Sequence, residues 1–278
     1  MKKNFTRVVI LLTAVVFLYA SCTKNTIKPA ATGTTNVAID TKALSSQIAT
    51  EFYASITGQH GGNDVSKGLN SPLSSKITNK NKLVVNSVNP LCGYVIDTTY
   101  KFKTGYSPFI DTVKTYFGNF NFTYTCDAGK VNGYIVKDSL ANTESFGLNV
   151  NTFILAQKYA VKALDQTYKL VSMDGSLYVL SDLRNIEAPH YNITSSTYTL
   201  SGLRVNFSSG TADITSGEVT FKTVNTLFGG ETRYQYQVTD LSGTLQFLGN
   251  HKAKLTLVSI YGTFVYNVDL LTGVVTQV

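Results

Sequence analysis

The chain has 278 residues, enough to bury a sizeable core as one large domain or two modest ones. With 17 Tyr, 15 Phe, no Trp and only 15% charged residues, its composition favours strands over helices. The net charge of +7 becomes +4 without Lys2, Lys3 and Arg7, which belong to a segment expected to be removed, and this excess is too small to indicate a nucleic-acid partner.

Residues 1–21 have the organisation of an export signal. A basic start precedes an apolar run from Val8 to Ala20, about 13 residues long, whereas a membrane-spanning helix needs about 20. Small residues then lead to Cys22. The pattern therefore predicts a cleaved signal peptide.

The residues Ala20-Ser21-Cys22 resemble the lipobox of bacterial lipoproteins, with Tyr19 at a position where leucine is usual. The resemblance implies that residues 1–21 are removed and that Cys22 receives a thiol-linked lipid, with palmitate among its acyl chains, and becomes the mature N-terminus. It covers only the signal and implies nothing about the fold.

The residue after the cysteine indicates a location. Thr23 is not acidic, which resembles the outer-membrane pattern of such lipoproteins, and no acidic cluster of the kind linked to surface display follows. We therefore expect a lipid-anchored protein of the bacterial cell envelope, on the outer membrane and facing the periplasm. Surface display is the alternative.

Residues 22–40 are polar, rich in threonine and interrupted by Pro29 and Gly33, which predicts a flexible tether. Residues 41–81 are predicted to form a helix and a connector. The helix is expected over 41–57, because apolar residues recur there at every fourth position, after an Asp40 N-cap and before Gly58. Its apolar stripe is expected to lie on a sheet, and the Gly/Ser/Asn-rich remainder to be a mobile or functional loop.

Two alternating runs that carry Cys92 and Cys126 predict a hairpin held by a disulfide. With the cysteines opposite each other, the register also places Ile96 opposite Phe122. The same register pairs Tyr94 with Tyr124, Thr98 with Phe120 and Tyr100 with Gly118. The bond would close a loop of about 35 residues and stabilise the fold by roughly 4 kcal/mol. Two unpaired core cysteines are the alternative, which would suit a reducing compartment.

Residues 82–278 alternate between apolar and polar positions and predict a β-rich body, with a candidate internal boundary near 182–196. A hairpin is expected about Asp174-Gly175. Glycines that precede an apolar-x-apolar triplet predict further turns, at Gly175, Gly217, Gly243 and Gly262.

The predicted fold class is all-β. About ten or more strands should form an antiparallel meander, folded as a sandwich or curled into a partial barrel with the single amphipathic helix on its concave side. A transmembrane barrel is disfavoured, because its strands would be longer and more regular than these runs.

No catalytic residue, metal site or cofactor is predicted. His60, His190 and His251 are far apart in sequence and lack metal-ligand spacing. All three cysteines are assigned to lipid or disulfide. The acidic residues near expected turns are interpreted as turn-forming: Asp127, Asp174, Asp213 and Asp240.

Three functional hypotheses follow. The first is a non-catalytic binding or structural envelope lipoprotein whose β-body binds a protein, a glycan or an apolar ligand. One variant of it is a carrier similar to lipoprotein chaperones with an open barrel and a helix, which requires a wide apolar concavity. The second is a hydrolase of glycans or peptides, which requires two carboxylates, or a histidine and a carboxylate, in contact. The third is an adhesin or fibre subunit, which predicts two tandem sandwiches.

Overall fold

The computed structural model describes residues 40–67, 69, 92, 95–104, 112–185, 187, 191–208, 210–229 and 236–278. The predicted signal peptide, Cys22, nearly all of the predicted tether and most of the predicted connector lie outside these residues.

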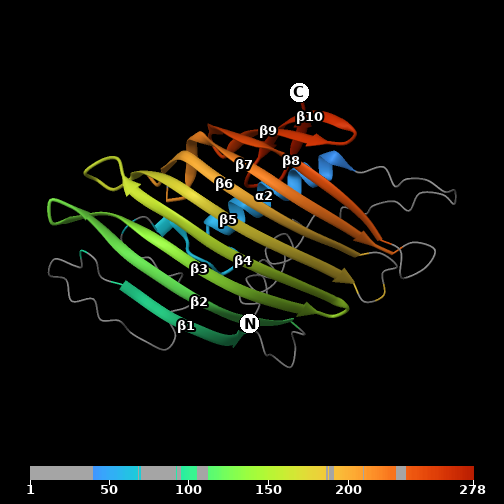
Figure 1. The fold of residues 1–278 in the computed structure, drawn as a ribbon, viewed down its shortest axis with the longest axis horizontal. Helices are drawn as coiled ribbons and strands as arrows, with labels where there is room; N and C mark the ends of the chain where they lie inside the picture. Colours follow the sequence, from blue (N-terminus) through green and yellow to red (C-terminus); the bar gives the residue numbers. More distant parts are fainter. Residues whose placement is uncertain are drawn as a thin grey trace, which may run out of the picture.

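Eleven strands form one antiparallel sheet in which each strand pairs with its neighbours in the chain, from β1 to β11. The strands are β1 (Val95–Thr104), β2 (Thr112–Asp127), β3 (Lys130–Phe146), β4 (Asn149–Ala163), β5 (Leu170–Asn185), β6 (Tyr191–Asn206), β7 (Asp213–Phe228), β8 (Tyr236–Gly249), β9 (Lys252–Ser259), β10 (Gly262–Asp269) and β11 (Val275–Gln277). The sheet curls without closing, since β1 and β11 are not paired with each other (Figure 1). The all-β meander is therefore confirmed in its curled form and not as a sandwich.

The helix α2 (Thr41–Ile56) forms where the sequence predicts it. Asp40 is the N-cap, because its Oδ1 accepts from the Ala43 backbone N–H at 2.9 Å. The helix ends before Gly58, whose φ of 71° lies in the left-handed region that stops a helix.

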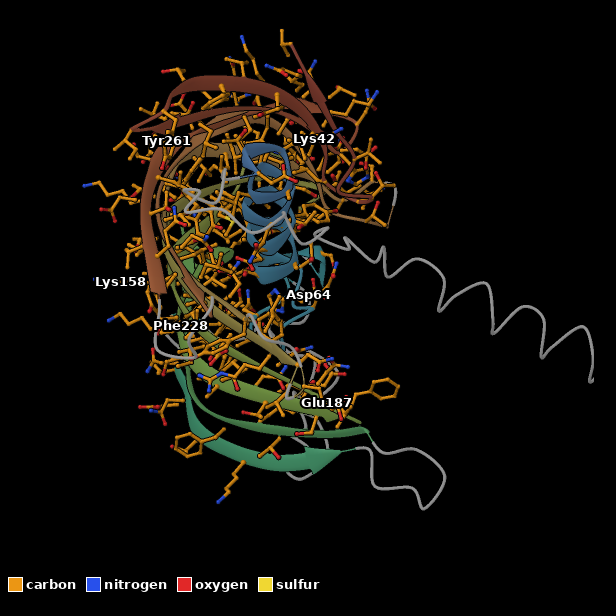
Figure 2. The ribbon with its side chains drawn as sticks, turned by 90° about the vertical axis from the view of Figure 1, so that its right-hand side faces the viewer. Lys42, Asp64, Lys158, Glu187, Phe228 and Tyr261 are labelled. Carbon is orange, nitrogen blue, oxygen red and sulfur yellow. A yellow bond between two sulfur atoms is a disulfide. The ribbon has the colours of Figure 1, made fainter. Side chains whose placement is uncertain are left out.

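The helix lies inside the curl of the sheet and supplies the centre of the core (Figure 2). Ile48, Phe52 and Ile56 have no exposed surface. The Phe52 ring lies 5.4 Å from that of Tyr198 and 5.7 Å from that of Phe247, measured between ring centroids. Because the sheet wraps around the helix, the polar residues Ser45, Glu51 and Ser55 are buried as well.

The chain that follows α2 covers a further part of the concave side. It contains a bridge between Thr57 and Asp64 and the short 3-10 helix η1 (Val65–Lys67). Gly62 lies against the side chains of Leu155 and Gln157 on β4. This portion of the predicted connector is therefore packed against the sheet.

The β1–β2 hairpin has the predicted register. Ile96 pairs with Phe122, Thr98 with Phe120 and Tyr100 with Gly118. A disulfide joins Cys92 to Cys126, with their Cα atoms 5.4 Å apart. The expected pairing of Tyr94 with Tyr124 lies outside the described residues.

The hairpin predicted about Asp174-Gly175 is wrong, because β5 continues through both residues. The register shifts between Met173 and Gly175, which marks a bulge. A Cβ at Gly175 would lie 2.3 Å from the Lys158 carbonyl oxygen, so the glycine permits a close approach of β4. Asp174 fixes the bulge by accepting the Gly202 backbone N–H at 2.7 Å.

Gly217 and Gly243 also lie inside strands, in β7 and β8, and only Gly262 of the four predicted turn glycines borders a two-residue turn. The strands are consequently longer than the sequence indicates. The candidate internal boundary near residues 182–196 contains the connection between β5 and β6. These two strands pair with each other, so the same sheet continues across the connection.

Candidate functional site

A buried cluster of amides and tyrosines closes the concave side where α2 ends. Asn63 donates from Nδ2 to Tyr159 Oη and from its backbone N–H to Gln157 Oε1, both at 2.8 Å. Gln157 donates from Nε2 to the Ser55 carbonyl at 2.9 Å. Burial raises the pKa of Tyr159 well above 10, so this phenol stays neutral. These contacts hold residues 58–67 on β4 and give the cluster a structural role.

Glu51 is a buried carboxyl group between α2 and β5. Its Oε1 accepts from Ser181 Oγ at 2.7 Å and from Gln47 Nε2 at 2.8 Å. Burial raises the pKa of Glu51 above 4.5, and the two hydrogen bonds oppose this rise only in part. Because only 7% of the residue is exposed, the raised pKa does not by itself make Glu51 a catalytic acid.

His251 and Asp213 meet at a surface pocket that Asn206, Ser208 and Asn250 also line. The contact runs through the backbone, since the Asp213 carboxylate accepts the N–H groups of Asn250 at 3.0 Å and His251 at 2.9 Å. Asp213 thereby stabilises the β8–β9 turn, in which both residues have positive φ. The side-chain pairing of histidine with carboxylate that a hydrolase requires is not made here.

The His251 ring is held by α2. Its Nδ1 lies 3.2 Å from Tyr53 Oη, which donates to the Ala212 carbonyl at 2.7 Å. Burial, with the nearby charges of Asp213 and Asp64, raises the pKa of Tyr53 to about 12, so the phenol is neutral at physiological pH.

The other residues considered from sequence do not gather into a site. His60 stacks on Phe153 with ring centroids 4.5 Å apart, and Asp127 and Asp240 are exposed on β2 and β8. His190 lies outside the described residues, as does Cys22. Within the described part of the chain, no group of three or more His, Cys, Asp or Glu side chains could hold a metal ion.

One end of the sheet presents apolar side chains to solvent. This end carries the β3–β4 and β9–β10 turns and the start of α2, and it lies at the right of Figure 1. Ile260 is 84% exposed and Tyr261 53% in one turn, and Phe146 is 58% exposed beside Leu148 in the other. Each turn thus exposes two large apolar side chains, and exposed apolar groups that lie together mark interaction surfaces.

Sequence reasoning missed these residues. The alternation places a turn between residues 258 and 263, and its two central residues are Ile260 and Tyr261. Two-residue hairpin turns usually contain Asn, Asp or Gly, so a pair of large apolar residues there was the available signal.

No family model, no curated protein and no solved structure matches the chain. Among the described residues, none of the helices has the length and apolar character that crossing a membrane requires.

Proposed function

We propose that this protein is a bacterial cell-envelope lipoprotein, anchored by a lipid on Cys22, whose curled sheet is a non-catalytic binding or structural body acting through its outer surface. The observation that supports a body acting through its outer surface is the concave side from β4 to β10, which α2 and residues 58–67 fill. The core side chains of α2, including Phe52, occupy the space in which an open sheet would hold a ligand.

The filled core argues against the carrier variant. A carrier of apolar ligands needs a wide apolar concavity, whereas the concave faces of β5 to β10 pack on α2 in one continuous core. Residues 58–67 add a second cover over β4 through Asn63 and Gln157. A protein, a glycan or an apolar surface would then be bound on the outside of the molecule.

The disulfide supports an exported location. Bonds such as Cys92–Cys126 persist in oxidising compartments, among them the bacterial periplasm and cell surfaces, and are rare in the cytosol. This agrees with the export signal proposed for residues 1–21 and with an outer-membrane anchor facing the periplasm.

The two alternative functions lack a specific observation in their favour. A hydrolase would use side chains in contact, and Asp213 instead caps a turn. An adhesin built from tandem sandwiches would contain two sheets, and the described strands form one.

Cys22→Ala tests the anchor. Metabolic labelling with a tagged fatty acid should mark the unsubstituted protein and not the Cys22→Ala protein, because the Cys22 sulfur is the proposed point of attachment. A double variant with Cys92→Ala and Cys126→Ala keeps the lipobox and should retain the label. Equal labelling of all three proteins would reject lipidation at Cys22.

A further inference from the structure

The β9–β10 turn has an apolar tip that the core does not use. Ser259 pairs with Gly262, and Ile260 and Tyr261 between them project from the sheet. Neither residue has a positive φ. Turn geometry therefore does not require large apolar side chains at these positions, where polar residues would be better solvated.

The same corner of the sheet extends the apolar surface. Val278 is 71% exposed, and its backbone N–H donates to the Val265 carbonyl at 3.0 Å, which holds it next to β10. Val258 on β9 is exposed, and its side chain lies on the same face of the sheet as that of Val265 on β10. We call Val258, Ile260, Tyr261 and Val278 the apolar corner.

The chain enters α2 at this end of the sheet. Thr41 Oγ1 lies 2.7 Å from Tyr266 Oη on β10, and Ser46 Oγ donates at 2.6 Å to the carbonyl of Gly273, beyond the far end of that strand. The N-terminus of α2 is therefore directed toward the β9–β10 turn. Figure 2 looks onto this end, with Lys42 and Tyr261 both in its upper part.

We propose that the apolar corner docks onto the bilayer that holds the Cys22 lipid, with Ile260 and Tyr261 inserted at the membrane interface. This inference rests on the proposed lipid anchor. Seventeen residues separate Cys22 from Asp40, so the chain between them spans at most about 65 Å whatever its conformation. The anchored segment therefore joins the folded body at the same end of the sheet from which the corner projects.

The side chains of the apolar corner favour a bilayer over a protein partner. An aliphatic side chain beside a tyrosine suits the interface, where an aromatic ring is buried while its hydroxyl remains hydrated. A protein partner would need a pocket that matches the projecting turn, whereas a fluid bilayer needs none. None of the four side chains of the corner is charged, so we expect the corner to dock onto neutral lipid without a need for anionic headgroups.

The chain contains no tryptophan, so Tyr261→Trp introduces a single fluorescent reporter. The full lipidated protein would be reconstituted into phosphatidylcholine vesicles with and without brominated phosphatidylcholine. Interfacial side chains sit about 5–10 Å into the headgroup and acyl boundary, so the reporter should shift to the blue and lose roughly half of its emission to the bromines.

Tyr168→Trp is the matched control. Tyr168 is an exposed aromatic residue between β4 and β5, at the opposite end of the sheet. It should show neither the shift nor the quenching, although the protein is anchored equally well. An unquenched Tyr261→Trp reporter on protein that floats with the vesicles would overturn the docking and leave the anchor standing.

Two further outcomes would also reject the inference. Protein with Cys22 intact that does not float with vesicles would remove the anchor and the docking with it. A blue shift in vesicle-free solution that grows with protein concentration would assign the corner to a second copy of the chain. Adding Ile260→Asn to the Tyr261→Trp protein should weaken quenching while flotation stays unchanged.

Discussion

At the scale of single residues, buried polar groups on the concave side show how α2 is fixed. Tyr198 Oη donates to the Ile48 carbonyl at 3.0 Å, and Gln47 donates to the Thr194 hydroxyl on β6. Ser46 and Tyr53 donate to backbone carbonyls in the β10–β11 and β6–β7 connections. Each contact satisfies a group that burial removes from water, which would otherwise cost about 1–3 kcal/mol. Glu51 differs from these groups because a carboxyl group ordinarily ionises in the acid range, whereas a phenol ordinarily ionises near pH 10.

Glu51→Gln should change how stability depends on pH. The folded-state pKa of Glu51 is raised above 4.5, so its contribution to stability is fully present below about pH 4.5 and is lost as pH rises toward the folded-state pKa. The Gln variant should lack this loss and gain in melting temperature relative to the unsubstituted protein as pH rises from 4.5. Thermal unfolding across a pH series measures the effect. Glu218→Gln, at an exposed position on β7, is the control, and parallel curves for both variants would contradict the prediction.

At the scale of elements, glycines inside strands allow neighbouring backbones to approach closely. Gly243 lies within β8, where a Cβ would come within 1.9 Å of the Thr256 carbonyl oxygen on β9 and 2.7 Å of the Phe221 ring on β7. The glycine therefore lets β8 sit between its two partners at a tightly packed point of the curl.

Gly243→Ala should destabilise the protein by at least about 3 kcal/mol, because β9 or the Phe221 ring must move. Gly202→Ala provides the contrast. Gly202 has a φ of 59° and open space around its Cβ position, so alanine there should cost only about 1–2 kcal/mol of backbone strain. Urea unfolding of both variants compares the two costs, and a smaller loss for Gly243→Ala than for Gly202→Ala would be inconsistent with the packing described.

At the scale of the whole molecule, the described residues form one α-helix, α2, that packs against a sheet of eleven strands. Phe52 contacts the rings of Tyr198 on β6 and Phe247 on β8, so strands that are not adjacent share one helical side chain. The core forms a single cluster that runs from β2 to β11. We therefore expect α2 and the sheet to unfold together.

Phe52→Ala should lower the free energy of unfolding by about 3–5 kcal/mol while keeping one cooperative transition. Phe117→Ala removes the same ring from the outer face of β2, where the side chain is 52% exposed, and should cost less than about 1 kcal/mol. Circular dichroism and tyrosine fluorescence during urea unfolding should give coincident curves for both variants. Separate transitions for the two probes in Phe52→Ala would show that the helix and the sheet unfold independently.

Features that depend on short-range periodicity could be predicted from the amino-acid sequence. Apolar residues at every fourth position, together with the Asp40 cap, predict α2. Alternation with matched aromatic faces predicts the β1–β2 register and its disulfide. These features depend on residues that are close in the chain or directly paired, so a local pattern is sufficient to identify them.

The role of the glycines, the choice of one curled sheet and the position of the apolar corner depend on contacts between distant parts of the chain. A turn and a close approach of strands favour the same residue, which is why the sequence predicts turns at Gly175 and Gly243 where the structure has close approaches. Likewise the sequence shows that Ile260 and Tyr261 are apolar, but their exposure at the same end of the sheet as the start of α2 depends on strands separated from the helix by about two hundred residues. Such placement results from long-range packing around α2, which alternation along one strand does not encode.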